Sequence, residues 1–225
     1  MTDTEVKETK PVEKKSSWLK YLLLLLIPLA GWGLYQGYWI IFPDKDTISL
    51  PLVPGHQFVY SGVYKSRSGG AKPITLTADN HRIVVERELD FEGQKRYFVA
   101  FYQGEYNLAR IILSQDDQGI YTVSGRNHKT LSIPREVRRG QSWNYEFGST
   151  KITGTVGPRK IIKTGLGDLE GREITLTSSE HNTIKLWINN EYGIIAFNYK
   201  FVFQGSNESE AELILKSEGE VGKGE

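Results

Sequence analysis

The longest apolar run in the chain covers residues 21–42 and contains no formal charge. A helix needs about 20 apolar residues to cross the hydrocarbon core of a membrane, and no polar stripe marks this run as the helix of a soluble core. Trp18 and Trp39 lie near its two ends, as in the aromatic belts of membrane helices. The pattern predicts a transmembrane helix over residues 18–42.

The charges on either side of this helix predict its orientation. Five lysines lie before the apolar run of residues 21–42, whereas Asp44, Lys45 and Asp46 follow it. Because positive residues stay on the cytoplasmic side, we expect a cytoplasmic N-terminus and an extracytoplasmic C-terminal part, in the periplasm or at the cell surface. A cleaved secretory signal is the alternative, but its apolar core has only about 7 to 15 residues and a small-x-small cleavage site follows it.

Gly33 and Gly37 form a GxxxG pair within the predicted helix. This spacing lets two membrane helices approach closely. We therefore name these two glycines as a candidate helix–helix contact; the alternative is that they are ordinary glycines of a membrane helix.

The rest of the chain shows a two-residue alternation of apolar and polar positions, interrupted by turn residues, which is typical of antiparallel strands. Strands are predicted at 58–64, 83–91, 96–103, 107–113, 120–124, 143–147, 151–156, 172–177, 183–188, 194–203 and 211–216. Segments 96–103 and 194–203 are apolar on both faces, as in the middle of a covered sheet or in a curled sheet.

The fold class expected is therefore mainly β, with an N-terminal transmembrane helix followed by a strongly curved antiparallel sheet, half-barrel or barrel-like. Residues 1–17 and 217–225 are too polar to offset the entropy of ordering and are predicted to be disordered tails. The β domain is expected over residues 47–216. A Gly-x-x-aromatic-x-Tyr sequence occurs twice, starting at Gly55 and at Gly140, and indicates two related halves.

The amino-acid composition limits the kinds of partner and binding site that the chain can have. There are 28 Lys and Arg against 27 Asp and Glu, for a net charge of +1, so nothing in the charge favours nucleic acid as a partner. With no Cys, the chain has no disulfides, no thiolate metal site and no lipidated N-terminal cysteine. None of the four histidines has another at the helical metal-binding spacing, and neither a metal nor a cofactor is expected.

No catalytic constellation stands out either, and we do not expect an enzyme. Neither Ser61 nor Ser124, each followed by Gly, has the strand–turn–helix setting of a hydrolase nucleophile. Acidic residues such as Glu86 and Asp116 are the remaining route to acid–base chemistry if they pair in space.

The chain contains one basic cluster, Arg135, Arg138 and Arg139. Such a cluster can contact anionic lipid headgroups or an acidic partner. The alternative interpretation is a solvated loop before a strand.

Segments 134–145 (with Pro134, Gly140, Trp143 and Tyr145), 163–177 and 186–197 together resemble uncharacterised bacterial cell-envelope proteins. In these, a Pro-x-x-x-Gly-x-x-Trp-x-Tyr strand precedes a Thr-x-x-Gly hairpin and a Trp-bearing strand. The resemblance covers the second half of the chain and implies a curved antiparallel sheet similar to periplasmic lipoprotein carriers. It implies no catalytic residues.

The leading hypothesis is a membrane-anchored, non-enzymatic cell-envelope protein whose β domain binds an apolar ligand or a protein segment near the membrane. The alternative is a structural or assembly subunit of a larger membrane complex. Membrane lipid and a protein of such a complex are the expected partners. The candidate ligand or partner surface comprises Trp143, Tyr145, Trp187 and Phe197 together with Arg135, Arg138 and Arg139.

Overall fold

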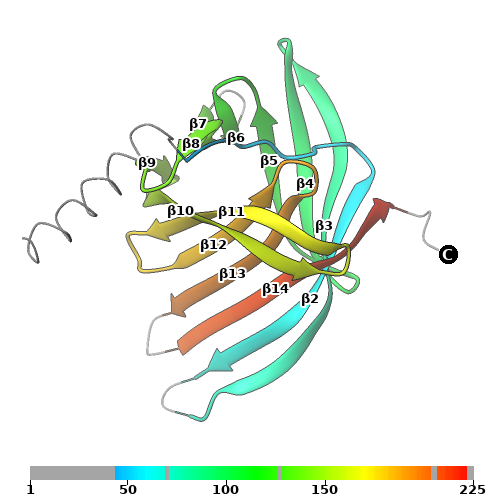
Figure 1. Cartoon of the computed structure of the whole chain (residues 1–225), viewed down its shortest axis with the longest axis vertical. Helices are drawn as coiled ribbons and strands as arrows, with labels where there is room; N and C mark the ends of the chain where they lie inside the picture. Colours follow the sequence, from blue (N-terminus) through cyan, green and yellow to red (C-terminus); the bar gives the residue numbers. More distant parts are fainter. Residues whose placement is uncertain (1–43, 69–70, 126–127, 204–206, 222–225) are drawn as a thin grey trace, which may run out of the picture. The chain divides into compact units, whose positions relative to one another are not determined.

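The computed structural model of the chain describes residues 44–68, 71–125, 128–203 and 207–221. From Lys45 onwards the chain forms one compact unit made of strands (Figure 1). Over the described ranges, no helix is long and apolar enough to cross a membrane. The predicted span 18–42, with its candidate contact Gly33 and Gly37, lies outside those ranges.

Twelve strands form one antiparallel sheet, which confirms the predicted fold class of the β domain. In chain order they are β2 (His56–Arg67), β3 (Ile74–Phe91), β4 (Gln94–Gln103), β5 (Tyr106–Gln115), β6 (Gly119–Ser124), β7 (His128–Pro134), β9 (Ser142–Phe147), β10 (Thr150–Thr164), β11 (Gly167–Ser178), β12 (Thr183–Asn189), β13 (Gly193–Phe203) and β14 (Asn207–Glu220). β1 (Lys45–Thr47) and β8 (Glu136–Arg138) form a separate two-stranded sheet. β14 continues past residue 216, where the β domain was predicted to end, because its last residues pair with the start of β2.

The sheet consists of two six-stranded meanders, β2–β7 and β9–β14, joined where β2 pairs with β14. A short strand precedes each meander, β1 in the first half and β8 in the second, and these two strands pair with each other. Gly55 and Gly140 precede the two meanders with φ of 82° and 80°, a conformation that glycine adopts without strain. The repeated sequence motif thus marks equivalent positions in the two halves.

The two halves meet at two seams of different kinds. Along one seam, β2 and β14 pair from Arg67–Glu208 to His56–Glu220. At the other, β7 and β9 are the two ends of the strand order, and the indole Nε1 of Trp143 on β9 donates a hydrogen bond of 2.9 Å to the carbonyl of Ser132 on β7. Figure 1 shows how the curled sheet brings β7, β8 and β9 together. The sheet is therefore nearly closed.

The core lies on the concave face of this sheet. Tyr60 on β2 is fully buried there; its hydroxyl donates a hydrogen bond of 2.7 Å to the carbonyl of Ile194, and its ring meets that of Phe197 edge to face at 5.1 Å. Burial raises the pKa of Tyr60 far above its usual value. At the end of β14, the backbone N–H of Val221 donates a hydrogen bond of 2.8 Å to the carbonyl of Gly55.

Candidate functional site

The segment 45–53, which we call the strap, leads from β1 towards β2 and packs against the core. Its buried side chains occur at every second position: Ile48 is 2 % exposed, and Leu50 and Leu52 pack on the buried cluster. This is the two-residue periodicity of an extended chain. The backbone N–H of Ile48 donates a hydrogen bond of 2.6 Å to the carbonyl of Arg135.

After Ile48, side chains of the sheet recognise the backbone of the strap. The N–H of Leu50 donates to Oε1 of Gln115 at 2.8 Å, and Nε2 of Gln115 donates to the carbonyl of Leu50 at 3.5 Å. The N–H of Ser49 donates to Oδ1 of Asn190 at 3.3 Å. The amide of Gln115 therefore imitates the donor and acceptor of a neighbouring strand.

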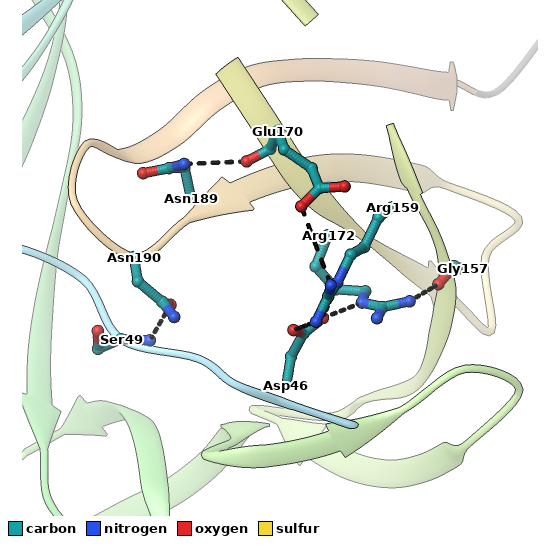
Figure 2. A network of polar contacts seen from close by, with 8 residues as sticks. All are labelled: Asp46, Ser49, Gly157, Arg159, Glu170, Arg172, Asn189 and Asn190. Atoms are coloured by element: carbon teal, nitrogen blue, oxygen red, sulfur yellow. Dashed lines mark hydrogen bonds and ion pairs between the residues drawn. The ribbon is translucent and has the colours of Figure 1, made fainter. Parts of the chain in front are cut away.

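A carboxylate and two guanidinium groups hold the first part of the strap. Asp46 accepts hydrogen bonds from Nε of Arg172 and from Nε and Nη2 of Arg159, the last two from one guanidinium group. Figure 2 shows both arginine side chains pointing from β10 and β11 towards this carboxylate. Arg172 also donates a hydrogen bond of 2.9 Å to the carbonyl of Gly157. We call Arg159 and Arg172 the arginine pair.

Burial differs between the members of this cluster. The side chain of Arg172 is 2 % exposed, that of Asp46 is 16 % exposed and that of Arg159 is 43 % exposed. Burial raises the pKa of Asp46, but the hydrogen bonds and charges of the arginine pair outweigh it, so that its pKa lies below the usual 3.8. Asp46 is therefore ionised at neutral pH, and it neutralises a guanidinium group that water does not reach.

A polar cleft of about 360 Å³ opens beside Asp46. Its polar walls are held by contacts within the protein: Nδ2 of Asn189 donates to the carbonyl of Glu170 at 2.9 Å, and Oδ1 of Asn189 accepts from the N–H of Glu191 at 2.9 Å. Figure 2 shows Asn189 and Asn190 on the side of the cleft opposite Arg159. These contacts hold the cleft in a fixed shape next to the strap.

An apolar cavity of about 70 Å³ lies on the other side of the strap. Leu50 and Leu52 of the strap line it together with Tyr60, Val99 and Leu113 of the sheet. An apolar cavity of about 150 Å³ accepts a molecule of benzene. The cavity is thus too small for an acyl chain, and the strap leaves part of the apolar space beneath it empty.

The aromatic residues named from the sequence lie at separate places. Trp143 spans the seam between β7 and β9, and burial raises the pKa of its neighbour Tyr145 to about 12. Phe197 packs in the core on Tyr60. On Trp187, the ammonium of Lys160 lies 5.6 Å from the ring centre, and the buried Nε1 finds no acceptor among the described residues.

The three arginines named from the sequence also have different surroundings. Arg135 is half-buried, and its Nη1 donates a hydrogen bond of 3.1 Å to the carbonyl of Asp116. Arg138 and Arg139 are exposed at the end of β8, where Arg138 pairs in register with Lys45 of the strap. Arg135 contacts the strap through its backbone hydrogen bond to Ile48, and Arg138 through the pairing of β8 with β1. The basic cluster therefore adjoins the site.

The residues that hold the strap were not identified from the sequence. In the sequence, Asp46 is one of the charges that flank the predicted helix, and no other role was predicted for it. Gln115 ends a strand, and Arg159 and Arg172 lie in strand-like segments far along the chain. The one local signal was an acidic residue directly before the alternating apolar positions of residues 48–52.

No protein-family model matches the sequence, and no curated protein matches it. Two solved structures are similar in fold. A candidate exported protein with a YmcC-like fold from Bacteroides fragilis shares 10 % identity over 77 % of this chain and 100 % of its own, with a TM-score of 0.46. A candidate lipoprotein from Parabacteroides distasonis shares 7 % identity over 77 % of this chain and 99 % of its own, with a TM-score of 0.39.

Proposed function

We propose that this is a membrane-anchored, non-enzymatic cell-envelope protein whose β domain binds an extended protein segment near the membrane. The observation that carries this proposal is the strap itself, an extended chain whose backbone is bound by Gln115 and Asn190 and whose carboxylate is bound by the arginine pair. Hydrogen bonds to the backbone and a site for a particular side chain are the contacts by which proteins recognise extended peptides. In this proposal the segment 18–42 anchors the chain, with the N-terminus in the cytoplasm and the β domain in the periplasm or at the cell surface.

Two features favour a protein segment over a lipid and binding over catalysis. The cavity of about 70 Å³ leaves no room for an acyl chain while the strap is in place. Asp46, the carboxylate that the arginine pair binds, has a lowered pKa, whereas a general base works best with a pKa near the operating pH. An apolar ligand would fit only if the strap moved out.

Native mass spectrometry of the full-length protein, released from its own membrane in mild detergent, tests this function. A defined mass containing a second protein in fixed stoichiometry is the expected result. A monomer that retains lipid would replace the proposal with a lipid carrier, and a bare monomer would contradict it.

A structural or assembly subunit is the second candidate. The filled concave face favours it, because Tyr60, Phe197 and their neighbours occupy the space that a carrier would keep open. A partner of this kind would contact the outside of the sheet. Its stoichiometry in the same experiment would then be unaffected by Asp46→Asn, whereas a partner bound in place of the strap would respond to it.

A further inference from the structure

We propose that the groove beneath the strap is a binding site for an acidic and apolar segment of a partner protein, and that the strap occupies this site as an internal competitor. The partner segment carries a carboxylate in the place of Asp46, followed at every second residue by apolar side chains in the places of Ile48, Leu50 and Leu52. This inference rests on the proposed function and adds the chemistry of the partner and the means of regulation.

The first argument is that residues outside the strap bind its carboxylate, the backbone N–H groups of Ile48, Ser49 and Leu50, and its buried leucines. The arginine pair belongs to β10 and β11, Gln115 to β5 and Asn190 to the turn after β12. The apolar walls come from β2, β3, β4, β5 and β13. A second chain with the same pattern can therefore make the same contacts.

The second argument is the charge of the emptied groove. Without Asp46, the guanidinium of Arg172, which is 2 % exposed, would lose the carboxylate that accepts a hydrogen bond from its Nε. Loss of a charged partner from a buried ion pair is costly. A partner segment with a carboxylate at this position restores the pair, and a segment with an amide there does not.

The third argument is that the strap fills its groove incompletely. The cavity beside Leu50 and Leu52 remains empty at about 70 Å³, and an unfilled apolar space loses packing contacts. A segment with phenylalanine at these two positions buries more apolar surface, and we expect about tenfold tighter binding than for a leucine segment.

The strap is also suited to release. Its backbone pairs with β8 over three residues only, and side chains bind the backbone of Ser49 and Leu50. After Leu52 the chain passes through Val53, Pro54 and Gly55 before β2 begins. As a tethered competitor the strap acts at an effective concentration on the order of millimolar. Weakening the strap therefore strengthens the binding of a partner segment, and this is the regulatory element of the site.

The test uses the full chain, which contains no cysteine, so that one introduced thiol reports one position. Ile48→Cys places a thiol on the strap at a site that is 2 % exposed, and Leu213→Cys places one in the core of β14 at a site that is 1 % exposed. Each protein is treated with a maleimide in the absence and presence of a peptide that copies residues 44–54 with phenylalanine in place of Leu50 and Leu52. A second peptide carries asparagine in place of Asp46.

The expected result is a rise of about tenfold in the labelling rate of the strap thiol with the acidic peptide, at an unchanged rate for the core thiol. The asparagine peptide should require about tenfold higher concentration. The inference is overturned if the labelling rate of the strap thiol does not change or if the two peptides raise it equally. It is also overturned if the labelling rates of both thiols rise in parallel, because that result reports unfolding.

Two protein variants sharpen the test. Arg159→Ala removes an arginine that is 43 % exposed, and it should reduce the difference between the two peptides while the protein stays folded. Asp46→Asn should tighten peptide binding, as measured by fluorescence anisotropy. A peptide difference that survives Arg159→Ala unchanged contradicts the role of the arginine pair. These outcomes concern the groove alone, whereas native mass spectrometry reports whether a partner exists.

Discussion

Trp143 and Ser132 are joined by a hydrogen bond of 2.9 Å across the seam at which the sheet does not close. The equivalent seam between β2 and β14 is a continuous ladder. The side chain of Trp143 thus links β9 to β7, whereas backbone pairing links β2 to β14. The ring of Trp143 lies over Gly154 of the adjacent strand.

Replacing Trp143 by phenylalanine should lower the free energy of unfolding because the carbonyl of Ser132 loses its donor. Trp187→Phe is the matched control: it removes the same ring volume, but its Nε1 has no acceptor among the described residues. We expect Trp143→Phe to be about 1 kcal/mol more destabilising than Trp187→Phe, as measured by urea denaturation. Equal losses would show that the hydrogen bond across the seam contributes nothing.

Gly154→Ala should disturb the same place by steric conflict. A Cβ atom at position 154 would lie 2.3 Å from the indole of Trp143, so the ring must move. Overpacking of this kind costs about 1 to 3 kcal/mol. Gly219→Ala on β14, where a Cβ meets nothing within 4 Å, is the control in the same denaturation experiment. A wild-type midpoint for Gly154→Ala would mean that the indole is not held over the glycine.

Asp46→Asn should be strongly destabilising because it removes the charge of the carboxylate that is paired with the buried Arg172. Removing one partner of a buried ion pair costs about 3 kcal/mol. The exposed pair Lys45–Glu136, at 2.7 Å on the neighbouring strands, provides the control: Glu136→Gln should cost at most about 1 kcal/mol. Similar losses in the two variants would contradict the special role of the arginine pair.

The stabilisation by Asp46 should depend on pH. Because the pKa of Asp46 is lower in the folded protein than the usual 3.8, its contribution is fully present above that value and is lost as the pH falls through the folded pKa. The difference in unfolding free energy between the wild type and Asp46→Asn should therefore be constant from pH 5 to 7 and shrink below about pH 4. A constant difference down to pH 2 would rule out this linkage.

Tyr60→Phe removes the hydrogen bond between the Tyr60 hydroxyl and the carbonyl of Ile194 in the middle of the core. The carbonyl is left without this donor, and we expect a loss of about 1 kcal/mol in urea denaturation. Tyr106→Phe, at a site that is 79 % exposed, should leave the midpoint unchanged. A neutral Tyr60→Phe would indicate that another donor reaches the carbonyl.

The strands of the β domain could be predicted because their alternation is local. Every strand predicted from the pattern has a counterpart in the sheet. The strand of residues 128–134 lies between a turn and Pro134 and was not recognised, and β1 and β8 have three residues each, too few to show a period. The curvature was anticipated from strands that are apolar on both faces.

The site was not predicted, because its members are distant in sequence. Asp46 lies 113 residues from Arg159 and 126 from Arg172, and each of the three is unremarkable in its own segment. Only the register of β10 with β11, in which Arg159 is paired with Arg172, brings the two guanidinium groups side by side. The aromatic residues, in contrast, stood out in the sequence because they are large, and the structure uses Trp143 and Phe197 for packing and closure.

The hydrogen bond from Val221 to Gly55 offers a place for a reporter. It fixes the end of the last strand beside Gly55, two residues after the C-terminal end of the strap. Val221 is 51 % exposed, so Val221→Cys would carry a fluorophore next to the base of the strap without altering any residue of the strap or its groove. Movement of the strap would then appear as a change in emission from the opposite end of the chain.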